Sequence, residues 1–428
     1  LLILVSLNAQ ATDLMSLYDR ALQHNIEILD NKINLDIANE SLIQTRSTVF
    51  PEINLRAQAG ETVIERYKSL GSYVPSDYDS DTYNLSIKQP LIHLYVFDEI
   101  KKAKSAIKQN EISRDNADSL LILESVRHYF NLIKYNNLVK LNHARNEFRQ
   151  SQFMASKKLL ENGSISINDH ETFKNEYNKS KNEVRLSENS LSEIKNDIFV
   201  FSGKELNDIN DIKLTKLNHK SFELDNLLES AFINNNSIKI SRENININRS
   251  EISAQKSRHY PTIDIVAEFD YVDITQGGSQ FGATTREDTS ISLVLNFPIF
   301  NGGYQSSKIR EARMNYNKAR LDHKNSRRVV QKEVSDNFNK YNTYRELYST
   351  SLEVLKTKLN RYDNAQDGFE KGIYTDAQVL ESKVDYLQSL AESKNIMMDY
   401  LYTEMTLEYL RNNLSVSALR RVNSYLVW

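Results

Sequence analysis

The stretch that decides the fold reads PTIDIVAEFDY, residues 261–271. Its apolar and polar side chains alternate with a period of two, which predicts a β-strand with one apolar face and one polar face. Three further stretches share this alternation: EINLRAQA at 52–59, YNLSIK at 83–88 and SISLVLNF at 290–297. Taken in chain order, the four stretches predict two β-hairpins.

Outside these hairpins the chain has few residues that end a helix. Only 11 glycines and 5 prolines occur among 428 residues, and all five prolines fall within 51–90 and 261–298. The long intervals 92–259 and 304–428 hold two glycines each, namely Gly163, Gly203, Gly368 and Gly372. The stretch 98–161 would span roughly 95 Å at the 1.5 Å rise of an α-helix. We therefore expect very long helices.

Apolar residues in the last third of the chain keep a helical period. They step by threes and fours through Val330, Val334, Phe338, Tyr341, Tyr344, Tyr348, Leu352, Leu355, Leu359 and Tyr362. This spacing predicts one apolar stripe along a helix, and we interpret its aromatic members as inter-helix packing and not as a ligand path.

The landmarks recur at an offset of 208 to 210 residues, which indicates an internal duplication. The matching pairs are Ala21 with Ala231, Pro51 with Pro261, Pro90 with Pro298, and Gly163 with Gly372. The predicted segments of the first half are a helix at 12–50, a membrane hairpin at 51–92 and a long helical hairpin at 93–202. Those of the second half are a helix at 223–260, a membrane hairpin at 261–300 and a long helical hairpin at 301–412. Residues 203–222 and 413–428 are expected to be an equatorial linker and an equatorial C-terminal segment.

Residues 1–11 predict the remnant of a secretory signal peptide, because an apolar run precedes the A-x-A pattern of residues 9–11. A short buried N-terminal helix or strand is the alternative. The chain has no cysteine, which excludes disulfides, zinc-thiolate sites and thiol catalysis. The formal net charge of −3 gives no reason to expect a nucleic-acid partner.

The strands have the length and alternation of outer-membrane strands. Unpaired strand edges are costly in lipid, and four strands are too few to close a barrel, so several chains must share one. The linkers 67–81 and 275–288 are polar and rich in tyrosine or glycine, as expected of exterior loops. The turns at Gly163 and Gly372 would then mark the periplasmic mouth.

At this point the sequence resembles the TolC-type outer-membrane efflux proteins over essentially its whole mature length. The residues that carry the resemblance are Val49-Phe50-Pro51-Glu52-Ile53, Tyr260-Pro261-Thr262-Ile263-Asp264, Asn296-Phe297-Pro298-Ile299-Phe300-Asn301-Gly302-Gly303 and the turn segments 162–169 and 369–381. The resemblance implies a homotrimer in which four strands per chain form a shared 12-stranded β-barrel, while antiparallel helical hairpins form an α-barrel below it. It also implies an outer-membrane channel that works with a periplasmic adaptor (membrane fusion) protein and an inner-membrane pump or ABC exporter, in efflux or type I secretion.

The resemblance further implies roles for residues at the inner turns. By motif position, Asp169, Gln378 and Glu381 stand at the periplasmic entrance, where the family's acidic rings narrow the pore, and Gln378 replaces one family acid. Asn168, Phe369 and Tyr374 stand at the gating hairpin, where Phe369 and Tyr374 replace the usual gating pair. Gly163, Ser164, Gly372 and Ile373 are the expected adaptor-docking turns. Asp169 and Glu381 have an alternative interpretation as solvated carboxylates at helix starts.

Nothing in the sequence predicts an enzyme, a cofactor or a metal site. The eight histidines lie apart from one another, without metal-ligand spacing beside a carboxylate. The glycine-rich segment 277–282 lies between two strands and opens no helix, so it is not a phosphate loop. The alternative function is a structural coiled-coil protein, such as a periplasmic scaffold or an adhesin stalk.

Overall fold

The computed structural model describes residues 13–63, 67–69, 72–74, 78–206, 209–217, 219–274 and 284–427. The predicted signal remnant at 1–11 therefore lies outside the described residues. The chain divides into two units. Unit 1 comprises residues 1–33, 112–239 and 325–428, and unit 2 comprises residues 34–111 and 240–324.

The elements confirm a mainly helical fold with a smaller strand portion. The first half contains α1 (Leu14–His24), α2 (Ile26–Ser47), β1 (Glu52–Thr62), β2 (Tyr67–Ser69), β3 (Ser72–Val74), β4 (Tyr78–Ile92), α3 (Leu94–Glu161) and α4 (Ile167–Ser202). The second half contains β5 (Asp211–Ile212), α5 (Leu224–Asn234), α6 (Asn236–Ser257), β6 (Thr262–Ile274), β7 (Thr284–Asn296), α7 (Tyr304–Glu370), α8 (Asp376–Leu410), α9 (Val416–Asn423) and β8 (Leu426–Val427).

Each half begins with two helices where the sequence predicted one, because an asparagine ends one helix and starts the next. Asn25 closes α1 by donating its backbone N–H to the carbonyl of Ala21 at 2.8 Å. Its side-chain Oδ1 accepts the N–H of Glu27 at 3.0 Å, as an N-cap does at the start of α2. Asn235, at the equivalent position of the second half, closes α5 and accepts the N–H of Ile238 in the same way. The prediction of one continuous helix at 12–50 and at 223–260 is wrong at these residues.

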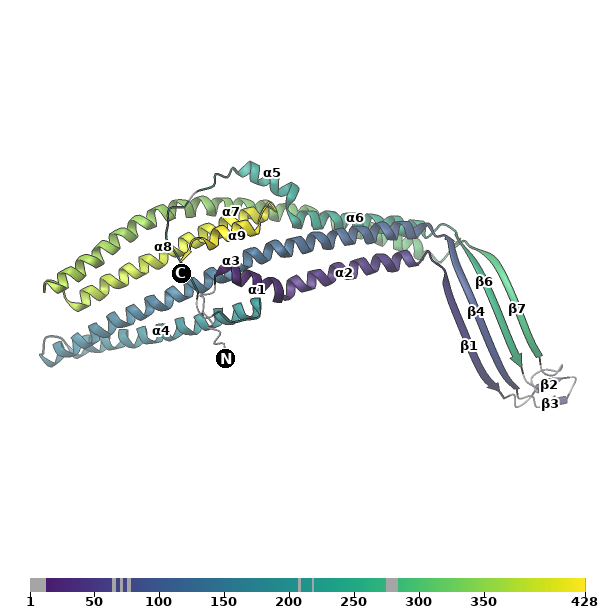
Figure 1. Cartoon of the computed structure of the whole chain (residues 1–428), viewed down its shortest axis with the longest axis horizontal. Coiled ribbons are helices and arrows are strands. Elements are labelled where there is room, and N and C mark those ends of the chain that lie inside the picture. The colour runs from purple at the N-terminus through teal and green to yellow at the C-terminus, as the bar shows by residue number, and fades with distance from the viewer. Residues whose placement is uncertain are drawn as a thin grey trace, which may run out of the picture. The chain divides into compact units, whose positions relative to one another are not determined.

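The strands of unit 2 form one antiparallel sheet in the order β1-β4-β6-β7, which Figure 1 shows as four adjacent arrows. Both predicted hairpins are confirmed, and β4–β6 pairing joins them across the two halves of the chain. In this register Leu55 lies opposite Leu85, Leu85 opposite Phe269, and Phe269 opposite Thr289. The first predicted exterior loop differs from the prediction at its end, because residues 78–81 continue β4.

The two faces of the sheet differ as the alternation predicts. On the apolar face the side chains are exposed in the single chain: Leu55 is 72%, Ile291 79% and Leu293 68% accessible. On the polar face Asn84 donates a hydrogen bond of 2.7 Å to the carboxylate of Asp270. The sheet therefore presents a wide apolar surface that must be covered by something other than water.

Unit 1 contains the α3–α4 and α7–α8 hairpin ends and the main apolar core. The core draws on α1, α3, α4, α5, α7, α8 and α9 and includes Leu14, Tyr129, Ile198, Leu227, Tyr341, Met397 and Leu419. The segment 209–217 is fastened to the C-terminal segment by the β5–β8 pair, in which Asp211 lies opposite Val427 and Ile212 opposite Leu426. In the described parts of the chain, none of the helices combines the length and the apolar character needed to cross a membrane.

Candidate entrance site at the helical hairpin turns

The turn between α3 and α4 ends one helix and starts another within five residues. Gly163 adopts a left-handed conformation with φ 70°, which glycine tolerates without steric cost. The N–H of Ser164 donates to the carbonyl of Leu159 at 2.8 Å, and the N–H of Gly163 donates to Leu160 at 2.9 Å. These two bonds satisfy the last carbonyls of α3 in a Schellman arrangement.

The turn between α7 and α8 repeats this backbone geometry in the second half of the chain. Gly372 has φ 73°. The N–H of Ile373 donates to the carbonyl of Gly368 at 2.7 Å, and the N–H of Gly372 donates to Phe369 at 2.9 Å. Both turns lie at the same end of unit 1 in Figure 1. The sequence prediction of two equivalent glycine turns is therefore confirmed.

Two of the predicted entrance residues, Asp169 and Gln378, are the third helical residues of matching capping boxes. The Asp169 carboxylate accepts the N–H of Ser166 at 3.1 Å, and Ser166 Oγ accepts the N–H of Asp169 at 3.2 Å. Gln378 Oε1 accepts the N–H of Thr375 at 2.9 Å, and Thr375 Oγ1 accepts the N–H of Gln378 at 3.4 Å. Both side chains thus stabilise the first turn of a helix. Glutamine keeps this bond without the charge, so the replacement at 378 preserves the turn.

The second turn differs from the first in a tyrosine that lies over a glycine. A Cβ built on Gly368 would come within 2.1 Å of Cδ2 of Tyr374, so only glycine fits beneath this ring. The equivalent residues of the first turn are Leu159 and Ile165, a larger and a smaller side chain in exchange. The Tyr374 ring remains 43% exposed.

The remaining predicted site residues are largely exposed. Glu381 is exposed on α8, and within the described chain no ion pair involves it. Asn168 is exposed at the start of α4, while Phe369 is 48% and Ile373 70% accessible. Ile167, beside the first turn, is 65% accessible. The turns therefore carry several apolar side chains in contact with water, which is the composition of a contact surface.

Side-chain contacts tie α8 to α3 just behind the turns, and sequence reasoning missed them. Ser151 Oγ on α3 donates to the Asp376 carboxylate at 2.9 Å. Lys383 Nζ on α8 lies 2.8 Å from Glu147 Oε2 on α3. The two partners of each pair belong to different halves of the chain and lie far apart in the sequence. No local pattern marks such pairs, because charged residues occur along every exposed helix face.

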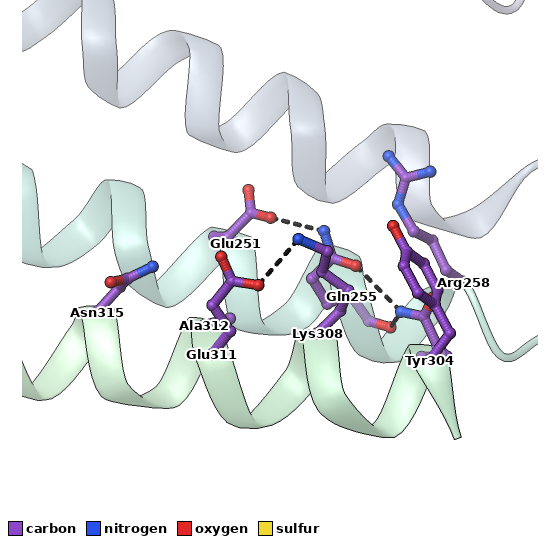
Figure 2. Close-up of a pocket in the computed structure, with 9 residues that line it drawn as sticks. Glu251, Gln255, Arg258, Tyr304, Lys308, Glu311, Ala312 and Asn315 are labelled. Carbon is purple, nitrogen blue, oxygen red and sulfur yellow. Dashed lines mark hydrogen bonds and ion pairs between the residues drawn. The ribbon is translucent and has the colours of Figure 1, made fainter. Parts of the chain in front are cut away.

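A polar cavity of about 210 Å³ lies between α6 and the start of α7 in unit 2, and Figure 2 shows its wall. Lys308 Nζ is 2.9 Å from Glu311 Oε2, and Gln305 Nε2 is 3.0 Å from Gln255 Oε1. Gln255 in turn donates to Glu251 at 2.7 Å. Because these groups satisfy one another, the wall serves to fasten α7 to α6. Among the described residues, no three His, Asp or Glu side chains gather closely enough to hold a metal ion.

An antiparallel sheet with an exposed apolar face, continued by long helical hairpins, defines a class of outer-membrane channel. The sequence model described as "Outer membrane efflux protein" matches residues 17–200 and 227–412. The chain belongs to this family, and its place is the outer membrane.

Individual relatives agree with this assignment. The outer membrane protein TolC of Escherichia coli strain K12 is 21% identical over 98% of this chain and 86% of its own length. The proteases secretion protein PrtF of Dickeya chrysanthemi is 22% identical over 78% of this chain and 73% of its own. The crystal structure of the Campylobacter jejuni CmeC outer membrane channel aligns with a TM-score of 0.74 at 14% identity, covering 97% of this chain and 90% of CmeC. These similarities establish the fold of an outer-membrane efflux channel.

Proposed function

We propose that three copies of this chain close into one barrel of twelve strands, with their helical hairpins forming a passive export duct below it. The observation that carries the proposal is the open sheet: in the described chain, β1 and β7 stand at the two ends of the strand order. Both edge strands belong to a sheet whose apolar face is exposed. An edge of unpaired N–H and C=O groups cannot remain in hydrocarbon, so each edge needs a partner strand.

The strand directions allow copies of the chain to supply that partner. All three pairings within the sheet are antiparallel, so β7 runs opposite to β1. The β7 of one copy can thus pair with the β1 of the next in the same antiparallel sense, and a ring of copies closes. Two copies would give eight strands, whose interior side chains fill, whereas three leave an open lumen. A duct therefore favours the trimer.

Cysteine crosslinking tests this closure, because the natural chain has no cysteine. Ala57→Cys on β1 is combined in turn with single cysteines along β7 from Thr285 to Ile291. We expect disulfide-linked trimers at one register of these pairs in outer-membrane preparations. Thr82→Cys on the internal strand β4, combined with the same β7 series, is the matched control and should give no link between chains. Monomers throughout the series would overturn the proposal.

At the far end of the duct, we propose that Asp169, Gln378 and Glu381 line the periplasmic entrance and that Asn168, Phe369 and Tyr374 belong to its gating hairpin. Three-fold symmetry would turn each carboxylate into a ring of three, which favours cations in a narrow pore. The exposure of Glu381 without an ion pair in the described chain supports a role of this kind. Replacing Asp169 and Glu381 by alanine should weaken cation selectivity and divalent block in planar bilayers, and unchanged conductance would count against it.

The same turns are proposed to bind a periplasmic adaptor, so that the duct serves an inner-membrane pump or ABC exporter. Support comes from the exposed apolar side chain of Ile373 and from the relatives, one of which is named a proteases secretion protein. Bulky substitutions at Ser164 and Ile373 should reduce adaptor crosslinking, while Gly163 and Gly372 set the turn geometry. Undiminished crosslinking of both variants would argue against docking at these turns.

A passive duct needs no chemistry of its own, so the absence of enzymatic activity remains a prediction. The alternative of a coiled-coil scaffold or adhesin stalk explains the helices but leaves the exposed apolar sheet without a purpose. The sheet therefore favours the duct.

A further inference from the structure

A small cavity in unit 1 lies between α3 and α8, beside the short strand β5. Its volume is about 110 Å³. The residues that line it are Asn137, Lys140, Leu141, Asp211, Leu387, Leu390, Ala391 and Lys394. None of them belongs to the entrance turns, so the cavity is separate from the site described above.

One wall of the cavity carries a hydrogen-bond donor without an acceptor. The Asn137 side chain is buried, with 8% of the residue accessible, and its Nδ2 has no partner in the described part of the chain. Buried amide groups are almost always paired, because an unpaired one loses its hydrogen bonds to water and gains nothing in return. The unpaired donor therefore points to a ligand that supplies an acceptor.

The charges of the wall favour a ligand with one negative charge. Lys394 Nζ lies 2.6 Å from the Asp211 carboxylate, and its side chain is 11% exposed, so this pair is neutralised within the wall. Lys140 is exposed at the edge, and no ion pair of the described chain includes it. The wall therefore has one positive charge in excess, next to the free N–H of Asn137.

The opposite wall is apolar. It consists of Leu141, which is buried, and of the half-buried Leu387, Leu390 and Ala391. An inorganic anion would leave this surface without contacts, and water would leave it poorly solvated. A ligand that matches both walls has a charged end and a short apolar end.

We propose that this cavity binds a short-chain monocarboxylate. The carboxylate accepts hydrogen bonds from Asn137 Nδ2 and Lys140 Nζ, and the alkyl part packs against the leucines. The size agrees, since a dry apolar cavity of about 150 Å³ accommodates benzene, so 110 Å³ holds roughly four or five non-hydrogen atoms. Acetate and propionate have that size.

Binding at this place would brace two hairpins against each other, because α3 belongs to one and α8 to the other. A ligand that binds only the folded state raises the midpoint of thermal unfolding in proportion to its occupancy. The site therefore has a readout that does not depend on transport, and its failure would leave the proposed duct unaffected.

The experiment uses the full chain, assembled and solubilised in detergent, with sodium propionate as the probe and sodium chloride at equal ionic strength as the reference. We expect propionate to bind in isothermal titration and to raise the unfolding midpoint, and chloride to do neither. Asn137→Leu and Lys140→Gln should each weaken propionate binding about tenfold. Lys157→Gln, the same charge change farther along α3, should leave it unchanged.

A cavity-filling variant separates binding from folding. Ala391→Leu occupies the space while adding only apolar volume, so it should abolish the propionate effect in a chain that still folds. Equal responses to propionate and chloride would mean a general salt effect and would overturn the proposal. No response to propionate would mean that water alone fills the cavity, which would overturn it as well.

Discussion

The two ends of α8 are held in opposite ways. At its C-terminal end Glu404 is 1% exposed and contacts Arg421 at 2.7 Å and Lys220 at 3.3 Å. At its N-terminal end the ties to α3 are the exposed Ser151–Asp376 bond and the half-exposed Lys383–Glu147 pair. Buried charges are costly to leave unpaired, whereas exposed pairs contribute little. The helix is thus fixed where it meets the core and lightly held at the proposed entrance.

This difference gives a physical basis for an entrance that can open. A segment with few buried contacts opens locally at a small cost, while the core opens only on global unfolding. If the proposed gate lies at the turns, breaking contacts there should alter conductance without unfolding the protein. Breaking contacts at the other end of α8 should unfold it.

The largest effect is expected from Glu404→Ala. The change leaves Arg421 without its buried partner, and breaking a buried pair costs about 3–5 kcal/mol in the free energy of unfolding. Denaturant titration of the detergent-solubilised chain measures this loss. Glu392→Ala, at an exposed position of the same helix, is the control and should change the free energy little. Equal effects of the two variants would remove the contrast between the ends.

The next effect concerns Glu408 and acid. Burial alone would raise the pKa of Glu408, but the hydrogen bond from Asn413 and the contact with Lys220 outweigh it and hold this pKa below its usual value. A depressed carboxyl pKa adds stability above the pKa of the unfolded chain, near 4.5, and that stability is lost as pH falls further. Unfolding midpoints measured from pH 7 to pH 3 should therefore drop on the acid side.

Glu408→Gln sharpens this test. The variant should lose about 1.5–3 kcal/mol at pH 7, the range for hydrogen bonds to charged groups. It should also show a smaller drop in acid than the natural chain. An unchanged pH profile in the variant would mean that other carboxyl groups cause the acid sensitivity.

A smaller, local effect is expected at the turns. Gly163→Ala and Gly372→Ala each force a Cβ into the left-handed region, at about 1–2 kcal/mol per residue. An added Cβ meets no other atom within 4 Å at either glycine, so backbone strain alone sets the cost and the two losses should agree. Hydrogen exchange of the Ser164 and Ile373 amides would measure them. A much larger loss at one turn would show that the two turns are not equivalent.

The smallest effect on stability is expected from the Lys383–Glu147 pair. Both side chains are partly exposed, at 35% and 54%, so a double-mutant cycle with alanine should give less than about 1 kcal/mol. The same variants should raise the open probability of the channel in planar bilayers, because the tie lies behind the proposed entrance. Arg149→Ala, which removes a similar pair with Glu176 between α3 and α4, is the matched control.

The sequence predicted the features that depend on local pattern. Alternation marked the strands, and glycines in otherwise unbroken helical sequence marked both turns, because φ near 70° at Gly163 and Gly372 requires glycine. The helix breaks at Asn25 and Asn235 escaped prediction, since asparagine is a weak signal until its side chain is seen to cap the following helix.

Features that depend on distant partners were beyond sequence reasoning. The β4–β6 pairing joins strands from the two halves of the chain, and neither strand indicates its neighbour. Glu404 looks like any helical glutamate, although Arg421 and Lys220 bury it. The resemblance correctly indicated the turns as the place to look, but the capping role of Asp169 and Gln378 became visible only in the structure.

Planar-bilayer recording of the detergent-purified chain, after its mass in solution has been determined, tests the proposed duct most directly. The expected result is a trimer that forms small, cation-selective openings, which divalent cations block from the side of the helical turns. A monomer that stays soluble without detergent and conducts no current would contradict the duct and favour the coiled-coil scaffold.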